Sequence, residues 1–430
     1  MDFSKVTAYL DSLEKLYHVP GFDLLIARDH EIIYRHSGGF SDYEKKIPVS
    51  AEDLYIMYSA SKVVTMTAVM QLLEQGRISL EDPVSMYLPE FSHMEVADHY
   101  ELNQMPPQRI PTLADPHHPA HTPITLRMLM TMTAGLNYEI GGTPILEMKE
   151  ATGNRATTRQ MMEAIAKMPL LFEPGTHYSY SLGHDVMAAV IEVVSGQTFG
   201  EYLKEHIFDP LEIRDVCFHP DESRQKRLTA QYAMEMNGDK LIQVPRTNAY
   251  RLTECYESGG AGLICTADAY LTVMDALACG GVGRTGARIL TEESLKKMAE
   301  NQLKPEILPD YQMPWRMEYG YGLGVRALIH PEDSPTPQGE FGWDSAGGAY
   351  TLVDPVHHIS ILYAQEVLNM IRSYSEIHPK LRNLIYECLS AGLRQRDGTI
   401  ARNTRGNADS CSPAKGESMV KSTAGKRPSC

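Results

Sequence analysis

The sequence predicts an α+β fold in which both ends of the chain supply strands to one antiparallel sheet and a mainly helical lobe is inserted between them. Near the N-terminus, "FDLLIARDHEIIYRHSGGFSD" indicates a hairpin with its turn at Asp29-His30-Glu31. Strand signals return late, where "GAYTLVDP" and "HISILYAQ" indicate a second hairpin across Asp354-Pro355. Between these hairpins, from Lys62 to about Val194, apolar residues recur mainly with a helical period.

The predicted helical lobe begins with an apolar helix that starts near Ser59 and ends near Gly76. A second helix begins in "PITLRMLMTMTAGL", and a third, "GHDVMAAVIEVVSG", ends at the glycine cap Gly196. Further along, "ESGGAGLICT" and "YGYGLGVRAL" are punctuated by glycine and rich in β-branched or aromatic residues. Each of these two segments is therefore predicted to form strand.

These elements define one domain at residues 1–393, with an α/β lobe from residues 1–61 and about 251–393 and a helical lobe from about 62–250. The last segment, 394–430, has no apolar periodicity and carries eight Lys or Arg against three Asp or Glu. We expect a disordered basic tail there, because the segment cannot bury enough apolar surface to offset the cost of ordering.

The composition excludes several classes of function. A net charge of -15 repels nucleic-acid backbones and anionic lipid. The sequence has no apolar run of about eighteen residues, and its N-terminus lacks the basic and apolar regions of an export signal. We therefore expect a cytoplasmic protein without a nucleic-acid or membrane partner. Seven cysteines without a CxxC pair make a disulfide framework or zinc site improbable.

Ser59 and Lys62 stand three residues apart at the start of the apolar helix, so both side chains fall on one helical face. Apolar surroundings and the positive end of the helix dipole favour the neutral amine of Lys62, which can accept the serine proton. The backbone N–H of Ser59 can donate to the oxyanion that forms when the serine attacks an acyl carbon. The alternative is that Ser59 caps the helix while Lys62 extends to the surface.

The pattern S-x-x-K also occurs elsewhere, at Ser12, Ser223, Ser294, Ser412 and Ser418. Those copies lie in charged amphipathic helices, in a charged loop or in the tail. Ser59 alone opens a helix that is apolar nearly all round, and such a helix is buried. The context therefore selects Ser59 as the candidate nucleophile.

Three ordered motifs, "SASK", "YSYSLGHD" and "FGWDSAGG", resemble those of the serine β-lactamase and penicillin-binding-protein superfamily, most closely its class C-like carboxylesterase (family VIII esterase-like) branch. The resemblance extends from Val6 to about Leu389 and implies a β-lactamase/transpeptidase-like fold. It also implies an acyl-enzyme on Ser59.

The same resemblance implies that Lys62 and Tyr180 transfer the proton, with Tyr178 as the alternative tyrosine, and leaves open which group is the formal base. The backbone N–H groups of Ser59 and Ala346 would form the oxyanion hole.

The departures from the family motifs bear on the substrate. Leu182 stands where the family has asparagine, and Trp343 replaces a lysine that would bind the carboxylate of a penicillin. Asp344 and Ser345 stand where the esterase branch has two glycines. We expect Leu182, Trp343 and Ser345 to line the substrate pocket, with Trp343 as an apolar wall that favours an uncharged ester.

The resulting expectation is a serine hydrolase of small carboxylic esters that needs no cofactor and no metal. The alternatives are a β-lactamase, a D-amino-acid peptidase or amidase, an acyltransferase, and a ligand-binding relative without turnover. Ser345 is a poor candidate nucleophile, because the sequence contains no GxSxG motif and no matching triad context. Prolines interrupt the group formed by His117, His118 and His121 with Asp115, which favours a solvated loop over a metal site.

Overall fold

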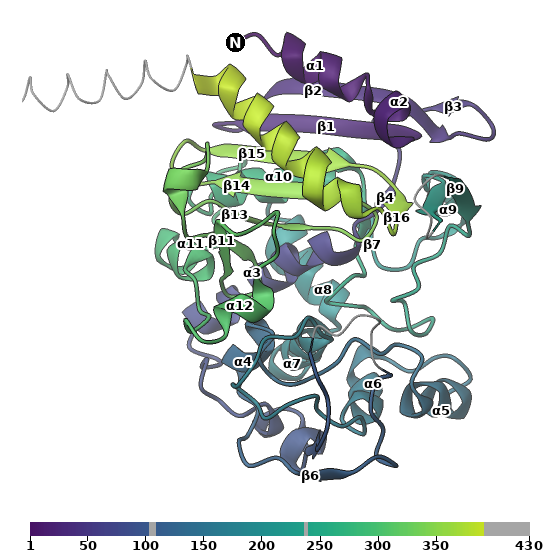
Figure 1. Cartoon of the computed structure of the whole chain (residues 1–430), viewed down its shortest axis with the longest axis vertical. Coiled ribbons are helices and arrows are strands. Elements are labelled where there is room, and N and C mark those ends of the chain that lie inside the picture. Colours follow the sequence, from purple (N-terminus) through teal and green to yellow (C-terminus); the bar gives the residue numbers. More distant parts are fainter. Residues whose placement is uncertain (103–108, 236–239, 391–430) are drawn as a thin grey trace, which may run out of the picture.

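One large antiparallel sheet joins the two ends of the chain, as the sequence predicts (Figure 1). The computed structural model describes residues 1–102, 109–235 and 240–390. In spatial order the strands are β11 (Tyr319–Tyr321), β12 (Arg326–Leu328), β13 (Phe341–Asp344), β14 (Tyr350–Asp354), β15 (Ile359–Ala364), β1 (Gly21–Arg28), β2 (Glu31–Asp42) and β3 (Ile47–Pro48). The junction between the chain ends is the β1–β15 pair, in which Leu25 lies opposite Leu362.

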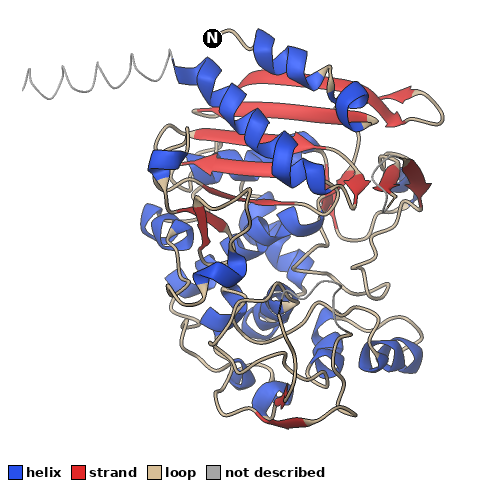
Figure 2. Cartoon of the chain, viewed as in Figure 1, coloured by secondary structure: helices blue, strands red, loops and turns tan. Residues whose placement is uncertain are grey.

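Helices cover both faces of this sheet (Figure 2). On one face lie α1 (Ser4–Leu10), α2 (Leu13–Tyr17) and the C-terminal helical segment 371–390, whose apolar side chains pack on Leu24 and Ile26. On the other face, α10 (Ala267–Ala278) contacts β1, β14 and β15. Side chains alternate between the faces along each strand, so Leu24 and Leu25 belong to separate cores.

The helical lobe is built around two apolar helices, α3 (Ser61–Glu74) and α7 (Gly183–Ser195), which pack against each other. α7 ends at Gly196, whose φ of 77° is the left-handed cap that glycine favours. The other α-helices of this lobe are α4 (Leu126–Met130), α5 (Thr143–Ala151), α6 (Thr158–Ile165) and α8 (Phe199–Leu203), whereas α9 (Glu222–Gln225) lies apart from them, beside β9 (Leu241–Val244) (Figure 1). The two remaining α-helices, α11 (Glu292–Ala299) and α12 (Leu308–Tyr311), follow α10 in the chain.

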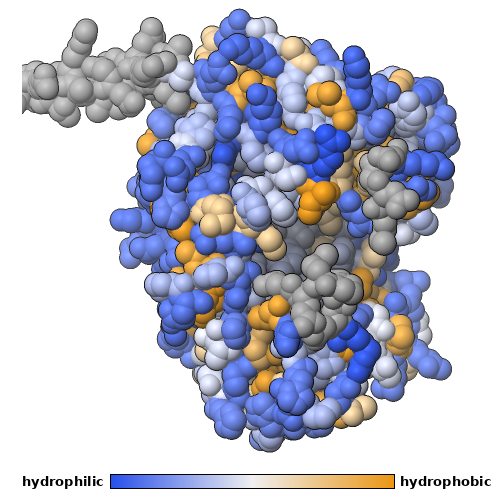
Figure 3. All heavy atoms as spheres, in the orientation of Figure 1, coloured by the Kyte–Doolittle hydropathy of each residue, from blue (hydrophilic) through white to orange (hydrophobic). Residues whose placement is uncertain are grey.

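The described residues also form three smaller sheets. They are formed by β4 (Tyr55–Ile56), β10 (Ile264–Cys265) and β7 (Val216–Cys217); by β16 (Val367–Leu368), β8 (Gln231–Met234) and β9 (Leu241–Val244); and by β5 (Glu95–Ala97) and β6 (His117–Pro119). Within the described ranges, no helix is both long and apolar enough to cross a membrane. Figure 3 shows that hydrophilic residues cover most of one face, with apolar residues in separate patches.

Two segments differ from the predicted strands. "ESGGAGLICT" contributes only β10 to a sheet, and the rest is a loop whose glycines allow close approach to α7. A Cβ on Gly259 would lie 2.4 Å from the His184 carbonyl oxygen, so only glycine fits there. "YGYGLGVRAL" forms two strands, β11 and β12, instead of one. The predicted tail, 394–430, lies outside the described residues, and the predicted domain boundaries stay a prediction.

Candidate active site

Ser59 lies on a single 3-10 turn, η1 (Tyr58–Ala60), between β4 and α3. The α-helix begins at Ser61, two residues after the predicted start, because the chain turns sharply first. Tyr58 has a φ of 42°, which is uncommon for a residue with a side chain, and its buried hydroxyl donates to Gln231. This anchored turn presents the half-buried Ser59 to a cavity of about 680 Å³.

Lys62 is completely buried, with an exposed fraction of 0%. Its Nζ donates to the Gly260 carbonyl oxygen at 2.7 Å and to the Tyr138 hydroxyl at 3.4 Å. Burial lowers the pKa of Lys62 to about 7, although the carboxylate of Asp185 acts in the opposite direction. The alternative in which Lys62 extends to the surface is therefore wrong, and a neutral amine is accessible near pH 7.

The Tyr180 hydroxyl lies in the same cavity as Ser59. It accepts a hydrogen bond from Trp343 Nε1 at 3.3 Å. Lys62 Nζ lies 4.5 Å from the centre of the Tyr180 ring. Burial raises the pKa of Tyr180 well above its usual range, so the phenol is protonated near neutrality. Tyr178 also lines the cavity, but its buried ring packs edge-on against Tyr311.

Asp185 is a buried carboxylate beside Lys62 that is not among the residues predicted for the site. Its Oδ1 accepts hydrogen bonds from the Tyr256 hydroxyl at 2.8 Å and from the Ser258 hydroxyl at 2.6 Å. These bonds hold the loop that carries Gly260, whose carbonyl oxygen positions the lysine. The sequence feature that could have indicated Asp185 is its position as an acidic residue in the first turn of a mainly apolar helix, five residues after Tyr180.

Gly260 is enclosed by the groups around the lysine. A Cβ on this residue would lie 2.5 Å from Asp185 Oδ2, 3.1 Å from the Tyr138 hydroxyl oxygen and 3.3 Å from Lys62 Nζ. Glycine therefore allows the backbone carbonyl to reach the amine while the carboxylate stays close. The Tyr138 ring also stacks on Tyr180, with centroids 5.3 Å apart.

Two backbone N–H groups are placed to bind an oxyanion. Among the described residues, neither Ser59 N nor Ala346 N has a hydrogen-bond acceptor, and both residues line the cavity. A tight turn holds Ala346, since Ser345 N donates to the Ala349 carbonyl oxygen at 2.9 Å and Gly348 N donates to the Ser345 carbonyl oxygen at 2.8 Å. The Ser345 side chain accepts a hydrogen bond from Gly347 N and is buried.

Asp344 fixes the strand end that leads into this turn. Its carboxylate accepts a hydrogen bond from Arg326 at 2.8 Å and lies 3.5 Å from His378 Nδ1. Burial opposes ionisation, but Arg326 and His378 outweigh it and lower the pKa of Asp344 to about 2. The replacement of a family glycine by Asp344 thus adds an ionic anchor behind Trp343.

Eight of the eighteen residues that line the cavity are aromatic. They are Tyr100, Tyr138, Tyr178, Tyr180, Tyr250, Trp315, Trp343 and Tyr374. The Trp343 ring stacks on Tyr180 with centroids 5.8 Å apart. Trp343 and Ser345 line the cavity as expected, whereas Leu182 does not and instead packs in the core of the helical lobe. The difference arises because Leu182 is the N-cap of α7 and its side chain is buried beneath that helix.

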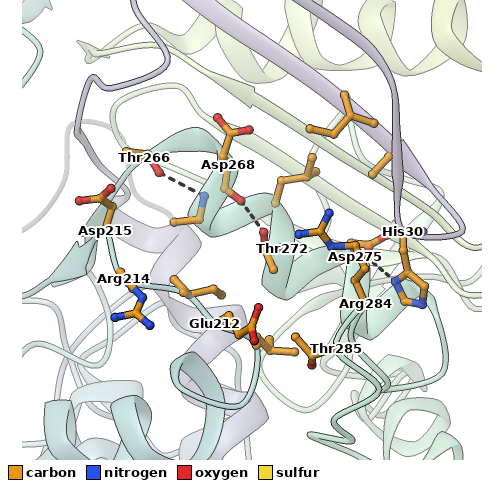
Figure 4. A pocket seen from close by; sticks show the side chains of 16 residues that line it. His30, Glu212, Arg214, Asp215, Thr266, Asp268, Thr272, Asp275, Arg284 and Thr285 are labelled. Atoms are coloured by element: carbon orange, nitrogen blue, oxygen red, sulfur yellow. Dashed lines mark hydrogen bonds and ion pairs between the residues drawn. The ribbon is translucent and has the colours of Figure 1, made fainter.

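A second cavity of about 500 Å³ lies between the β1–β2 turn and α10 (Figure 4). Ser59, Lys62 and Tyr180 do not line it. His30 and Asp275 face each other there, with His30 Nδ1 2.7 Å from Asp275 Oδ2. Asp268, on the same helix, pairs with Arg35 at 2.7 Å. The side chains of this second cavity form ion pairs and hydrogen bonds with one another, and its lining contains no serine beside a lysine. The cavity that Ser59 lines is therefore the candidate active site.

Comparison with known proteins identifies the class that this fold and site define. The Beta-lactamase family profile matches residues 6–370, and the chain belongs to that family. Esterase EstB of Burkholderia gladioli is 26% identical over 382 residues, which cover 84% of this chain and 89% of EstB. Lovastatin esterase of Penicillium rubens is 26% identical over 325 residues, 72% of this chain and 77% of that enzyme.

Solved structures show the same fold. EstCE1, described as a hydrolase with promiscuous acyltransferase activity, has a TM-score of 0.71 and 24% identity over 89% of this chain and 98% of its own. Simvastatin synthase (LovD) from Aspergillus terreus has a TM-score of 0.71 and 20% identity over 90% of this chain and 98% of its own. The fold is therefore the β-lactamase/transpeptidase-like α+β fold.

Proposed function

We propose that this chain is a serine esterase that cleaves carboxylic esters through an acyl-enzyme on Ser59. The observation that carries the proposal is the fully buried Lys62, whose pKa of about 7 makes its amine a proton acceptor at neutral pH. A ligand-binding relative without turnover needs no proton acceptor beside the serine, and burying a lysine without such a role is costly.

In the proposed acylation, Ser59 Oγ attacks the ester carbonyl carbon and its proton passes to the Lys62 amine, directly or through the Tyr180 hydroxyl. The carbonyl oxygen becomes an oxyanion bound by the N–H groups of Ser59 and Ala346. When the tetrahedral intermediate collapses, the C–O bond to the alcohol breaks and Tyr180 donates a proton to the leaving oxygen. Lys62 then returns its proton to Tyr180, which restores the starting protonation state.

Deacylation follows the same path in reverse, with water in place of the alcohol. The Lys62 amine removes a proton from the water as its oxygen attacks the acyl carbon, and Ser59 leaves with a proton from Tyr180. The assignment of Lys62 as the base, with Tyr180 as the donor to the leaving group, is supported by the opposite directions of their pKa shifts.

Esters are favoured over β-lactams because Trp343 presents a ring and an N–H group where a lactamase has a cation. Its Nε1 donates to Tyr180, so the ring supports the proton-transfer group and cannot neutralise a drug carboxylate. Arg316 also lines the cavity, but its Nε and Nη2 already donate to the Tyr311 carbonyl oxygen. An ester has an easier leaving group than a lactam and requires no carboxylate contact.

Acyl transfer to an alcohol in place of water is a second candidate, favoured by the aromatic side chains that line the cavity, because the apolar part of an alcohol can pack against them. Transfer and hydrolysis share the acyl-enzyme and differ only in the acceptor. Addition of a small primary alcohol to the ester assay separates them, since transfer yields a new ester in place of the free acid.

The test combines a substrate panel with covalent labelling. We expect kcat/KM for short-chain nitrophenyl esters to exceed that for a chromogenic cephalosporin by at least about a hundredfold, or roughly 2.7 kcal/mol of transition-state stabilisation. A fluorophosphonate should add one label to the peptide that contains Ser59, and Ser59→Ala should abolish both labelling and turnover. Ser345→Ala is the matched control and should keep the label.

Faster cleavage of the cephalosporin or of D-aminoacyl anilides would replace the esterase assignment with a lactamase or peptidase. Retained turnover in Ser59→Ala would overturn the mechanism itself.

A further inference from the structure

Two histidines and a carboxylate converge at the end of the helical lobe that carries β6 (Figure 1). His118 lies in β6, His121 follows that strand, and Glu173 comes from the segment after Leu170. Leu170 N donates to the Glu95 carbonyl oxygen at 2.7 Å, which brings this segment to the edge of the β5–β6 hairpin. The three residues do not line the ester cavity.

The sequence favoured a solvated loop over a metal site for the group of His117, His118, His121 and Asp115, whereas the structure places Glu173 beside His118 and His121. The Asp115 carboxylate instead accepts hydrogen bonds from Thr112 and Arg109. Because Glu173 is 52 residues away from His121 in the sequence, local spacing could not reveal it. One ligand atom from each of His118, His121 and Glu173 lies within 4.8 Å of the others.

His118 is held in the orientation that a metal ligand requires. Its Nδ1 lies 2.7 Å from Asp98 Oδ1, and its Nε2 lies 3.8 Å from Glu173 Oε1. When the ring is neutral and Nδ1–H donates to Asp98, Nε2 carries a lone pair that faces a carboxylate. Two electron-rich atoms then face each other, and a cation between them resolves the repulsion. A carboxylate bonded to the far nitrogen is the usual support of a metal-binding histidine.

We propose that His118, His121 and Glu173 bind one divalent transition-metal ion of the zinc class, with Asp98 orienting His118. Two imidazoles and one carboxylate are a donor set that zinc accepts, and water can supply a fourth ligand because the His121 side chain is 80% exposed. Metal–ligand bonds of about 2.0–2.2 Å require ligand atoms about 3.3 Å apart. His121 Nδ1 and Glu173 Oε1 are now 2.7 Å apart, so a small opening suffices.

The role of this site is structural. Glu173 already accepts a hydrogen bond from His121 N at 2.9 Å, so the ion would strengthen an existing contact between the hairpin and the segment that leads to Tyr180. If the ion binds the folded state and not the unfolded state, the free energy of unfolding rises with the logarithm of the metal concentration. Ester turnover by Ser59 should not require the ion, because no ligand touches the ester cavity.

A second group of three, His30, Asp275 and Cys279, is the weaker candidate. Both Asp275 oxygens are already used by His30, one by its backbone N–H at 3.2 Å and one by Nδ1 at 2.7 Å. Burial raises the pKa of the Cys279 thiol to about 12, whereas zinc binds the thiolate. This group serves as an internal comparison for the test.

The test titrates Zn²⁺ into the full-length protein after dialysis against a chelator, by calorimetry, and repeats the titration with Co²⁺ by visible absorption. We expect one ion per chain and at least tenfold weaker binding in His118→Ala and in His121→Ala. His117→Ala is the matched control, because His117 is an exposed neighbour whose Nδ1 is hydrogen-bonded to the Asp115 carbonyl oxygen. The zinc affinity of this variant should equal that of the unmodified chain. Cys279→Ser should also bind normally.

Thermal unfolding provides a second measurement. Zn²⁺ should raise the Tm of the unmodified chain and of His117→Ala but not of His121→Ala, and fluorophosphonate labelling of Ser59 should be unchanged in all of them. Equal zinc affinity in His118→Ala, His121→Ala and His117→Ala would overturn the proposal. So would binding lost with Cys279→Ser, or no bound ion in the unmodified chain, which would leave the histidines as ion-pair partners of Asp98 and Glu173.

Discussion

Asp185→Asn tests whether Lys62 is the base, because Asp185 is the charged group that opposes the fall in the lysine pKa. The distances from a Cβ on Gly260 to Asp185 Oδ2 and to Lys62 Nζ place these two atoms at most about 5.8 Å apart. At about 5 Å and an effective dielectric constant of about 20, one unit charge changes the free energy of the other by about 3 kcal/mol. That corresponds to roughly two pKa units.

The sign follows from the charge that is removed. Loss of the carboxylate destabilises the ammonium form, so the pKa of Lys62 should fall from about 7 toward about 5. Because the neutral amine is the active form, the acidic limb of kcat/KM should move to lower pH, and the active fraction at pH 6 should rise about tenfold. The plateau above pH 8 should drop, since a weaker base removes the serine proton less readily.

The assay is the pH dependence of nitrophenyl ester hydrolysis from pH 4.5 to 9. Asparagine retains an Oδ1 that can accept from Tyr256 and Ser258, so the loop geometry is expected to persist. Ser258→Ala is the matched control, because it removes one of these hydrogen bonds and keeps the charge, and its acidic limb should stay near pH 7. An acidic limb that does not move in Asp185→Asn, or moves to higher pH, refutes the assignment of Lys62 as the base.

Two further substitutions test the groups around this pair. Trp343→Phe keeps the ring that stacks on Tyr180 and removes the Nε1 donor, so kcat/KM should fall by about fivefold to tenfold, the value of one hydrogen bond, with little change in Tm; an unchanged kcat/KM would argue against the contact. Gly260→Ala forces a Cβ against Asp185 Oδ2 and should cost about 2 kcal/mol of stability, measured by denaturant unfolding, together with most ester turnover, whereas Gly141→Ala, which meets only the flexible end of Glu139, should be tolerated. Normal stability in Gly260→Ala would contradict the close packing.

Local patterns accounted for the parts of the fold that depend on near neighbours. The β1–β2 turn falls at Asp29 and His30 as predicted, and the β14–β15 turn at residues 355–358 begins within the predicted Asp354-Pro355 pair, because apolar period and turn residues lie within one short segment. β13 was not predicted as a strand, since its four residues include a glycine and an aspartate, and its place between β12 and β14 comes from tertiary pairing. "ESGGAGLICT" gave a false strand signal because its glycines serve close packing on α7.

The candidate site shows the same division. Ser59 and Lys62 could be found because they lie one turn apart, and Tyr180 because its motif is specific to a family. Gly260 could not, because it reaches the lysine from a distant segment, and a single sequence does not show which segments meet. Asp185 was marked only as an acidic residue in the first turn of an apolar helix, which does not show that it faces Lys62. Leu182 was misplaced because the position of a residue in a motif does not fix the direction of its side chain at the N-cap of a helix.

The pairing of β1 with β15 has a consequence for synthesis of the protein. Leu25 and Leu362 are partners in the sheet but are 337 residues apart in the chain. At about 5–20 residues per second, the ribosome exposes the apolar strand β1 about 20–70 s before its partner is made. During that interval one edge of the first hairpin is an open template for aggregation, so a chaperone that binds the nascent N-terminus should increase the yield of folded enzyme. A nonsense mutation anywhere before residue 359 leaves that edge open permanently.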